Sequence, residues 1–575
     1  MIVYGDPQYE TTSGALRARL RARLADGAGL DGLRSLLILA GQAEQAAADA
    51  GLPDAPWRAV TDNVASAFLA AWDGRSADVP PARERAARAL DALTGGPDAR
   101  VTVRLPEGFA CYALYPEQYV PALRAWLSDR AGRADRRALV VGVRSIGTTL
   151  SALAMTLLAA HGWEARRRTV RPTGHPYDRR VDLRPEDVAD AAWALAVDEG
   201  PGRSGSSLAA VAEALIAAGV GPDRVAFLPG HAGEPGGAAS TRVRAIWAAT
   251  PRYVGRADDL RWAGLSLTAC LAARTAELCG EPVTEMADLG GGGWRRAVYA
   301  DESGWPAVYT PFERPKRLCS LRGGGRVLWK FAGLADAGEG DQARAAADRQ
   351  RRRARAGWCP PPLGECLGFV ATPWVEGVAL TRSDGDHPAI LAHVGQYLAA
   401  SAGPPLGPAE AEAAWTRLRE MLVFNTREAL GEAAAGRAER RAEAVGTDGE
   451  APSAGDGRMA PHEWLRTPDG RIVKADAAGR DGDHTVVGRQ PLAWDIAGAL
   501  VEWGLMDEAV RPLLAALEAA GAPIPDPKAL RFYLPAYAAF RLGQAMLCAE
   551  GAERARLERA ADFYREALRR WLDPG

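Results

Sequence analysis

The feature that most constrains the fold of this chain is the alternation of short apolar runs with helical segments between about residues 100 and 260. Residues 138–143, 192–197 and 225–228 are apolar runs of strand length, and segments rich in Ala and Leu at helical spacing follow the first two. Strands that alternate with helices of about 10–15 residues imply βαβ units and a parallel sheet. Ligands of such sheets bind beyond the carboxyl ends of the strands. We therefore expect an α/β parallel-sheet domain with a binding site at that edge.

The whole chain is too long for one hydrophobic core, because 575 residues predict two large domains and a helical extension. Its formal net charge of -2 gives no overall attraction to nucleic acid or to an anionic membrane. The seven cysteines lack CxxC spacing, which argues against a structural zinc site and fits a reducing compartment. The N-terminus does not resemble a signal peptide, and no apolar run approaches the roughly 20 residues of a membrane span. The sequence therefore predicts a cytoplasmic protein with no nucleic-acid or membrane partner.

Two acidic residues and a Gly/Ser-rich segment mark the end of the second apolar run. Asp198 and Glu199 follow that run directly, so their carboxylates could accept hydrogen bonds from the two hydroxyls of a ribose. Residues 200–207 then lead straight into a helix, and backbone N–H groups, serine hydroxyls and the helix N-terminus together favour an anion. The alternative is a strand end with solvated acids, followed by an ordinary turn. The residues expected to bind the anion are Arg203, Ser204, Gly205, Ser206 and Ser207.

Residues 194–208, ALAVDEGPGRSGSSL, resemble the phosphoribosyl-pyrophosphate motif of the phosphoribosyltransferase family. That motif has four apolar residues, two acids, a short loop and then Thr-Gly-x-Thr-Leu. The resemblance implies that Asp198 and Glu199 hold the ribose and that residues 204–207 hold its 5-phosphate. This chain departs from the motif, because its second acid is Glu, its threonines are serines and its loop is one residue longer.

Two flanking segments have counterparts in the same family. Residues 142–149 follow a strand and open a helix, as the family's pyrophosphate-binding loop does, and Arg144 would clamp the leaving group. Residues 166–180 are basic and punctuated by Pro and Gly, and they stand where the family has a mobile loop. Arginine suits bidentate phosphate recognition, although a solvated loop is an equal alternative for this stretch. The further substrate-binding residues implied in the first loop are Ser145, Gly147 and Thr148.

A second set of residues resembles aminoglycoside phosphotransferase-like kinases. Residues 326–331 place Lys330, one of only four lysines, in an apolar strand after a Gly-rich turn, and residues 369–377 resemble the hinge between two kinase lobes. Residues 461–476 resemble the catalytic-loop and metal-binding region. The resemblance implies that Lys330 touches phosphates, that His462 lies at the nucleotide, that Asp476 binds Mg²⁺ and that Asp495 braces the catalytic loop.

The kinase-like region also departs from its family. No catalytic Asp follows His462, where Glu463 and Trp464 stand, and the metal-binding Asn is absent. Residues 341–355 contain no Glu to pair with the strand lysine. Such losses are typical of a degenerate kinase fold. Lys330 could instead be an ordinary strand lysine whose stem packs on apolar surface, with His462 a buried imidazole. Another alternative is a different metal site built from His462, Asp476, Asp481, Asp483 and His484.

These resemblances predict four segments and a transferase. We expect a helical N-terminal extension at residues 1–97, a phosphoribosyltransferase-like domain at 98–262, a helical linker at 263–295 and an α+β two-lobed kinase-like domain at 296–575, with an exposed polar loop near 446–457. The leading hypothesis is a phosphoribosyltransferase that uses phosphoribosyl pyrophosphate, Mg²⁺ and an unidentified small-molecule acceptor, releases pyrophosphate, and carries a kinase-like domain for nucleotide, such as ATP, or acceptor. The alternatives are a small-molecule phosphotransferase with a nucleotide-sensing N-terminal domain, or a non-enzymatic nucleotide-binding regulator. The composition is compatible with an oligomer.

Overall fold

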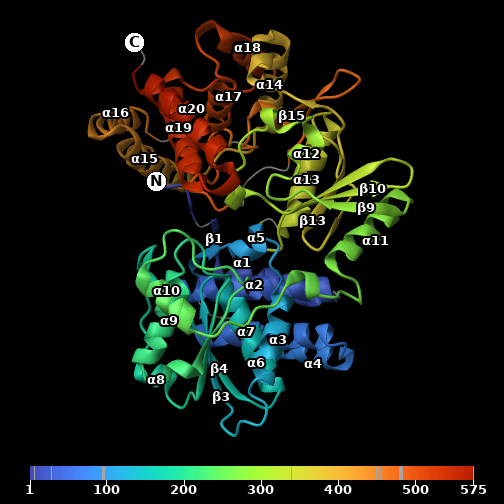
Figure 1. The fold of residues 1–575 in the computed structure, drawn as a ribbon, viewed down its shortest axis with the longest axis vertical. Helices are drawn as coiled ribbons and strands as arrows, with labels where there is room; N and C mark the ends of the chain where they lie inside the picture. Colours follow the sequence, from blue (N-terminus) through green and yellow to red (C-terminus); the bar gives the residue numbers. More distant parts are fainter. Residues whose placement is uncertain are drawn as a thin grey trace. The chain divides into compact units, whose positions relative to one another are not determined.

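The chain folds into two compact units in a computed structural model, which describes residues 1–5, 7–26, 29–93, 98–338, 340–446, 451–453, 455–477 and 483–573. The first, here the N-terminal unit, comprises Gln8–Cys270 and Gly333–Gln342. The second, the C-terminal unit, comprises Met1–Pro7, Leu271–Ala332 and Ala343–Gly575. Figure 1 labels their helices and strands.

The N-terminal unit is built on a four-stranded sheet in the order β4-β3-β7-β8, in which every neighbouring pair is parallel. The alternation of apolar runs and helices predicted parallel pairing, and these strands show it. Every residue of β7 is buried because the sheet is covered on both faces. The strands are β3 (Arg137–Val143), β4 (Glu164–Val170), β7 (Trp193–Val197) and β8 (Val225–Leu228), and the helices that follow β3, β7 and β8 are α7 (Ile146–Ala160), α9 (Ser206–Ala217) and α10 (Thr241–Ala249).

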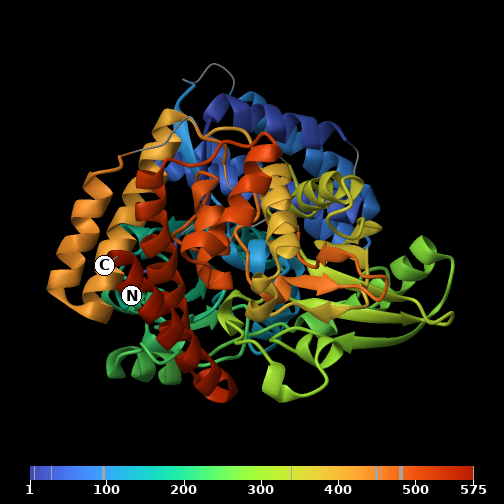
Figure 2. The same cartoon turned by 90° about the horizontal axis from the view of Figure 1, so that it is seen from above.

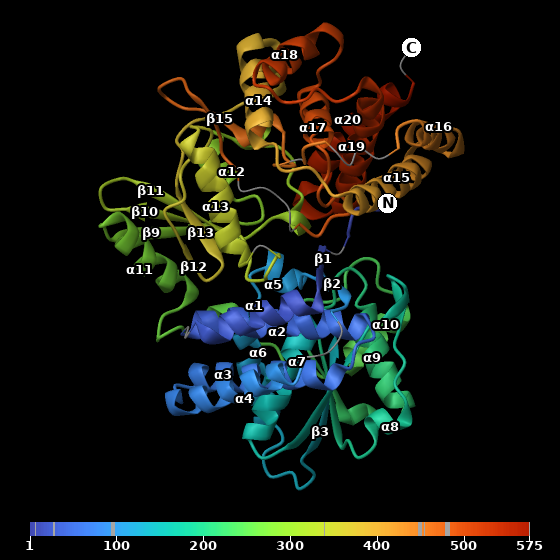
Figure 3. The ribbon, with the colours of Figure 1, turned by 180° about the vertical axis from the view of Figure 1, so that it is seen from behind.

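The first helices of the chain pack onto this sheet layer within the same unit. Helix α2 is almost wholly buried and contacts α3 and α7, and α3 also contacts α4 and α7 (Figure 3). Gly41 permits the approach of α2 to α7, because a Cβ there would lie 2.0 Å from Thr149 Oγ1. The buried Arg167 of β4 binds Glu44 of α2 in a bidentate pair at 2.8 Å. The elements are β1 (Gln8–Thr12), α1 (Ser13–Ala25), α2 (Leu30–Asp49), α3 (Asp54–Trp72), α4 (Val79–Asp91), β2 (Arg100–Arg104), α5 (Glu107–Cys111), α6 (Tyr119–Ser128) and α8 (Pro185–Val188).

The C-terminal unit contains a five-stranded antiparallel sheet in the order β12-β13-β11-β10-β9. Side chains alternate along β11, so Trp329 faces α11, where its Nε1 donates to Thr275 Oγ1 at 2.8 Å. Lys330 lies on the opposite face beside its partner Val370, which packs against α13. The elements are α11 (Leu267–Cys279), β9 (Val283–Asp288), α12 (Arg295–Val298), β10 (Lys316–Leu321), β11 (Arg326–Phe331), α13 (Gln342–Arg355), β12 (Gly364–Cys366) and β13 (Phe369–Pro373).

A helical subdomain with a small sheet completes the C-terminal unit. Helix α17 is buried along its whole length and packs against α19, which runs beside α20 (Figure 2). Asn425 of α15 fixes the chain's beginning, because it accepts from Ile2 N at 2.6 Å and donates to Ile2 O at 2.9 Å. The elements are β14 (Val378–Ala379), α14 (Pro388–Ser401), α15 (Pro408–Leu430), α16 (Glu432–Glu443), β15 (Trp464–Arg466), β16 (Ile472–Lys474), α17 (Ala493–Trp503), α18 (Arg511–Ala519), α19 (Pro527–Cys548) and α20 (Arg554–Leu572). No described helix has both the length and the apolar character needed to cross a membrane.

Candidate functional site

A cavity of about 190 Å³ lies in the C-terminal unit. Its walls come from the antiparallel sheet, from the segment that follows β13, from the loop before β15 and from α17 and α19. Lys330 of β11 lines the cavity, and so does Asp476, which lies two residues after the end of β16. The cavity therefore gathers all three residues that the sequence assigned to a nucleotide site, Lys330, His462 and Asp476.

Lys330 and Asp476 form the central ion pair of the cavity. Lys330 Nζ lies 2.5 Å from Asp476 Oδ2, and Arg458 Nη1 lies 3.2 Å from the same oxygen. Burial lowers the pKa of Lys330, and the charge of Asp476, which raises it, offsets this effect only in part. Burial alone would raise the pKa of Asp476, but the charges of Lys330, Arg458 and Lys474 outweigh it and hold that pKa well below its usual range. The strand lysine is thus paired with the acid after β16, whereas α13 offers no Glu.

The loop before β15 is held by a buried carboxylate. Asp495 of α17 accepts the backbone N–H groups of Gly455, Asp456 and Gly457 at 3.1, 3.0 and 2.8 Å. Burial, with the charge of Asp456, raises the pKa of Asp495 to about 6. From the other side, Arg353 of α13 donates to the carbonyl of Gly455. Asp495 therefore braces the segment that leads into the cavity lining.

This braced loop carries an acid that the sequence interpretation missed. Residues 446–457 were expected to be an exposed polar loop, and that expectation was wrong for Ser453 and Asp456, each 3% exposed. Asp456 accepts from the Tyr397 hydroxyl and lies 3.5 Å from Lys474 Nζ, so its carboxylate is directed into the protein and is absent from the cavity lining. The missed signal was an Asp-Gly pair shortly before the β15–β16 hairpin. The sequence interpretation instead placed the catalytic loop at His462, six residues after Asp456.

A second carboxylate, Glu463, stands beside Asp476. Its Oε1 lies 3.7 Å from Arg458 Nη1 and its Oε2 lies 3.3 Å from Lys474 Nζ. Burial lowers the pKa of Lys474, but the charges of Asp456 and Glu463 raise it by more. We call this set of alternating charges the charge cluster. Its members are Lys330, Asp456, Arg458, Glu463, Lys474 and Asp476.

The other end of the cavity is aromatic. His462 lines it and stacks on Trp294 with ring centroids 6.0 Å apart, and burial lowers the pKa of His462. Beyond it, Glu502 accepts from the Tyr537 hydroxyl at 2.9 Å and lies 3.0 Å from Arg541 Nε. The cavity therefore combines the charged end around Lys330 with an aromatic end that also holds the Glu502–Arg541 ion pair.

The donor set does not fit a divalent metal ion. Within the described parts of the chain, no group of three or more His, Cys, Asp or Glu side chains is placed to hold one. Mg²⁺ was expected at Asp476, and the guanidinium of Arg458 lies between this acid and Glu463, which also lines the cavity. A cation supplied by the chain therefore already bridges these carboxylates.

The described members of the alternative metal site are not placed together to hold an ion. Asp483 is paired with Arg314 at 3.0 Å, and His484 stacks on Phe312 with centroids 4.9 Å apart. Asp481 lies outside the described residues.

In the N-terminal unit, Asp198 and Glu199 stand at the carboxyl end of β7. Asp198 is half-buried, and its desolvation together with the charge of Glu199 raises its pKa well above the usual range. Glu199 Oε2 accepts from Gly108 N at 2.7 Å, and the Tyr119 hydroxyl donates to the Asp198 carbonyl at 2.8 Å. Both carboxylates thus lie at the edge where ligands of parallel sheets bind.

The Gly/Ser-rich loop follows these acids and ends at α9. Gly205 has a φ of 64°, which lets the chain turn into the helix at Ser206. The hydroxyls of Ser204 and Ser206 donate to the carbonyl of Pro176 at 3.2 and 3.0 Å. Pro176 is in the turn of a hairpin formed by β5 (Thr173–His175) and β6 (Asp178–Arg180). In this structure the hairpin therefore occupies two donors of the predicted phosphate cradle, which also contains Arg203 and Ser207.

The loop after β3 adjoins the same edge. Ser145 precedes α7, and Gly147 and Thr148 lie in its first turn. A Cβ at Gly147 would lie 2.7 Å from the carbonyl oxygen of Val197, so this glycine lets α7 approach the end of β7. Arg144 pairs with Asp49 at 3.0 Å.

The basic stretch 166–180 divides between two structures. Residues up to Val170 form β4, and the rest includes the β5–β6 hairpin. Arg167 is a buried residue of the sheet layer, whereas Arg180 of the hairpin is exposed.

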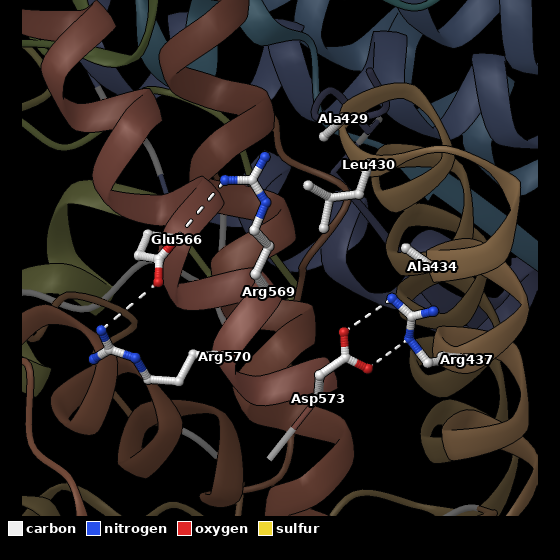
Figure 4. A pocket seen from close by; sticks show the side chains of 8 residues that line it. All are labelled: Ala429, Leu430, Ala434, Arg437, Glu566, Arg569, Arg570 and Asp573. Carbon is white, nitrogen blue, oxygen red and sulfur yellow. Dashed lines mark hydrogen bonds and ion pairs between the residues drawn. The ribbon is translucent and has the colours of Figure 1, made fainter. Parts of the chain in front are cut away.

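A second hollow in the C-terminal unit, of about 600 Å³, is open to solvent (Figure 4). Its arginines are met by acids: Arg437 Nε lies 2.7 Å from Asp573, and Arg569 and Arg570 each lie 3.8 Å from Glu566. These half-exposed pairs leave little net charge for a ligand. The remaining lining residues are Ala429, Leu430 and Ala434.

Comparison with known proteins gave matches among solved structures alone: no family model matches the sequence, and no curated protein matches it. Choline kinase LicA from Streptococcus pneumoniae is 13% identical with a TM-score of 0.34, over 52% of this chain and 98% of that chain. The macrolide 2'-phosphotransferase MphH from Brachybacterium faecium is 18% identical with a TM-score of 0.34, over 52% and 98%. The spectinomycin phosphotransferase APH(9)-Ia, in complex with ADP and spectinomycin, is 13% identical with a TM-score of 0.32, over 52% and 93%. All three are small-molecule phosphotransferases, and none of the three is a phosphoribosyltransferase.

Proposed function

We propose that the C-terminal unit binds the phosphates of a nucleoside triphosphate at Lys330 and transfers the terminal phosphoryl group to a hydroxyl of a small molecule. The observation that carries this proposal is the convergence of Lys330, Arg458 and Asp476 on one cavity. Phosphoryl transfer depends mainly on positioning and on neutralising the charge of the transferred group. A strand lysine and an arginine from a braced loop supply both.

The proposed transfer uses groups already in the cavity. The acceptor oxygen attacks the terminal phosphorus, the bond from that phosphorus to the bridging oxygen breaks, and the nucleoside diphosphate leaves. Lys330 and Arg458 offset the negative charge on the phosphoryl oxygens. His462 is neutral at pH 7 because burial lowers its pKa, so its imidazole can take the acceptor's proton. The aromatic end near Tyr537 and Arg541 is the place for the acceptor.

The test is consumption of ATP by the full-length protein, measured as ADP formation over a panel of small hydroxyl-bearing acceptors. Lys330→Met and Asp476→Asn are each expected to reduce turnover roughly 100-fold or more. Lys528→Met is the matched control, since Lys528 is exposed near the start of α19, and it should leave turnover unchanged. ADP formation that survives in Lys330→Met would refute the assignment.

A second candidate function rests on the N-terminal unit. There, two acids at the end of β7 are followed by a left-handed glycine and the N-terminus of α9, which is a favourable arrangement for a ribose phosphate. We propose binding of phosphoribosyl pyrophosphate at Asp198, Glu199 and residues 204–207, with Arg144 near the leaving group. Attack of a small-molecule acceptor on the anomeric carbon would transfer the phosphoribosyl group to that acceptor and release pyrophosphate.

Calorimetry with phosphoribosyl pyrophosphate, alongside measurement of released pyrophosphate, tests the second candidate. The double variant Asp198→Asn/Glu199→Gln should lose binding, whereas Asp223→Asn, an exposed acid of the same unit, should retain it. Undiminished binding in the double variant would remove this assignment. Ligand binding to either unit without any turnover would instead favour a nucleotide-binding regulator.

A further inference from the structure

Arg458 occupies a particular position in the charge cluster. One terminal nitrogen, Nη1, lies 3.2 Å from Asp476 Oδ2 and 3.7 Å from Glu463 Oε1, so a single guanidinium spans both acids. Asp476 is also bound by Lys330, and Glu463 is also bound by Lys474. Asp476 and Glu463 therefore each have two cationic partners from the chain.

The charges of the cluster are already balanced. Three cations, Lys330, Arg458 and Lys474, face three carboxylates, Asp456, Glu463 and Asp476. A divalent cation would have to displace two protein cations from partly buried carboxylates, and breaking ion pairs that are shielded from water is costly. An incoming phosphate, in contrast, offers Lys330 and Arg458 a new anionic partner.

Arg458 is also prepared to bind an anion. It directly follows Gly457, whose N–H is held by Asp495, and its side chain is 16% exposed. Burial lowers the pKa of Arg458, but Asp476 and Glu463 raise it by more, so the guanidinium stays charged. Its Nε is buried and has no hydrogen-bond partner among the described residues. Because the side chain is 16% exposed and a guanidinium carries five N–H donors, it can also donate to an oxyanion.

We propose that Arg458 takes the role of the divalent cation in this cleft, so that the nucleotide's phosphates bind to Arg458 and Lys330 directly and without a metal. This inference rests on the proposed nucleotide binding by the C-terminal unit. The reason is geometric, because the guanidinium of Arg458 lies between the carboxylates of Asp476 and Glu463, where a metal ion shared by these two acids would have to bind. Phosphate specificity then comes from the planar guanidinium of Arg458, which can donate two parallel hydrogen bonds to a phosphate.

The first experiment is calorimetric titration of the full-length protein with ATP, in excess EDTA and in excess Mg²⁺. We expect dissociation constants that agree within about twofold, since no metal contributes to binding. Arg458→Gln should weaken binding in EDTA roughly 10- to 100-fold, and Arg458→Lys should weaken it less because it keeps a charge. Arg466→Gln, which removes an exposed arginine of β15, is the matched control and should bind like the unaltered protein. Binding by the unaltered protein that requires Mg²⁺ would overturn the inference.

The second experiment needs no nucleotide. Mn²⁺ binding, followed by electron paramagnetic resonance, should be absent at Asp476 and Glu463 in the unaltered protein and should arise in Arg458→Gln, where both acids lose a cation. Circular dichroism establishes that the variant is folded. Mn²⁺ binding by the unaltered protein that is lost in Asp476→Asn would contradict the role of Arg458. If ATP fails to bind in either buffer while the Mn²⁺ results hold, the proposed function fails and the replacement of the metal stands.

Discussion

Replacing His484 by Phe should remove a defined pH dependence from the stability of the C-terminal unit. His484 is 3% exposed and stacks on Tyr4 and Phe312, with ring centroids 5.7 and 4.9 Å apart. Burial, with a smaller contribution from the charge of Arg314, lowers its pKa from 6.5 to about 4. Phe keeps an aromatic ring in the stack and cannot be protonated.

The sign and size of the effect follow from this pKa. The folded state binds fewer protons than the unfolded state between the two pKa values, so the stabilisation is present above pH 6.5 and is lost as the pH falls toward 4. Each pKa unit is worth about 1.4 kcal/mol, which gives roughly 3 kcal/mol for the full transition. Between pH 7 and pH 5 the loss is about 2 kcal/mol.

Urea unfolding at pH 7 and pH 5, followed by tryptophan fluorescence, measures this loss. The difference in unfolding free energy between the two pH values should be about 2 kcal/mol smaller in His484→Phe than in the unaltered protein. His387→Gln, at an exposed histidine, should leave that difference unchanged. An unaltered pH difference in His484→Phe would refute the reasoning, because comparing differences cancels the other titrating groups.

Three further substitutions test the framework of the two units. Asp495→Ala removes the acceptor of three backbone N–H groups and should cost roughly 2–4 kcal/mol in urea unfolding and weaken ATP binding measured by calorimetry. Arg295→Met leaves the buried carboxylate of Glu553 without its ion-pair partner and should lower the free energy of unfolding by about 3–5 kcal/mol. This loss should be smaller when Glu553→Gln is added in a double-mutant cycle. Gly41→Ala forces a Cβ against Thr149 and should destabilise the N-terminal unit by about 1–3 kcal/mol, measured by scanning calorimetry.

Local sequence patterns were sufficient to predict several strands and helices of the fold. The spacing of apolar residues and the positions of turn residues correctly predicted β7 before Asp198 and α9 after it. Strands and helices can be predicted in this way because each has its own apolar spacing over a few residues. The strand position of Lys330 was readable for the same reason. The loop held by Asp495 was expected to be exposed because its polar, Gly/Ala/Glu-rich composition is typical of exposed loops, and this expectation was wrong for Ser453 and Asp456. Its burial comes from bonds to α17 and α13, which lie far away in the sequence.

The sequence alone determined the kinds of residues available: a scarce lysine on a strand, an acid after a hairpin, and an acid pair before a Gly/Ser loop. Only the tertiary structure decided which charges meet. Lys330 and Asp476 are 146 positions apart, and Arg458 joins them through a loop that is fixed by α17. Coulomb energy depends on distance in space and on burial, and neither is encoded in local spacing. For that reason Asp476, where Mg²⁺ was expected, is paired in the folded chain with the cations of Lys330 and Arg458.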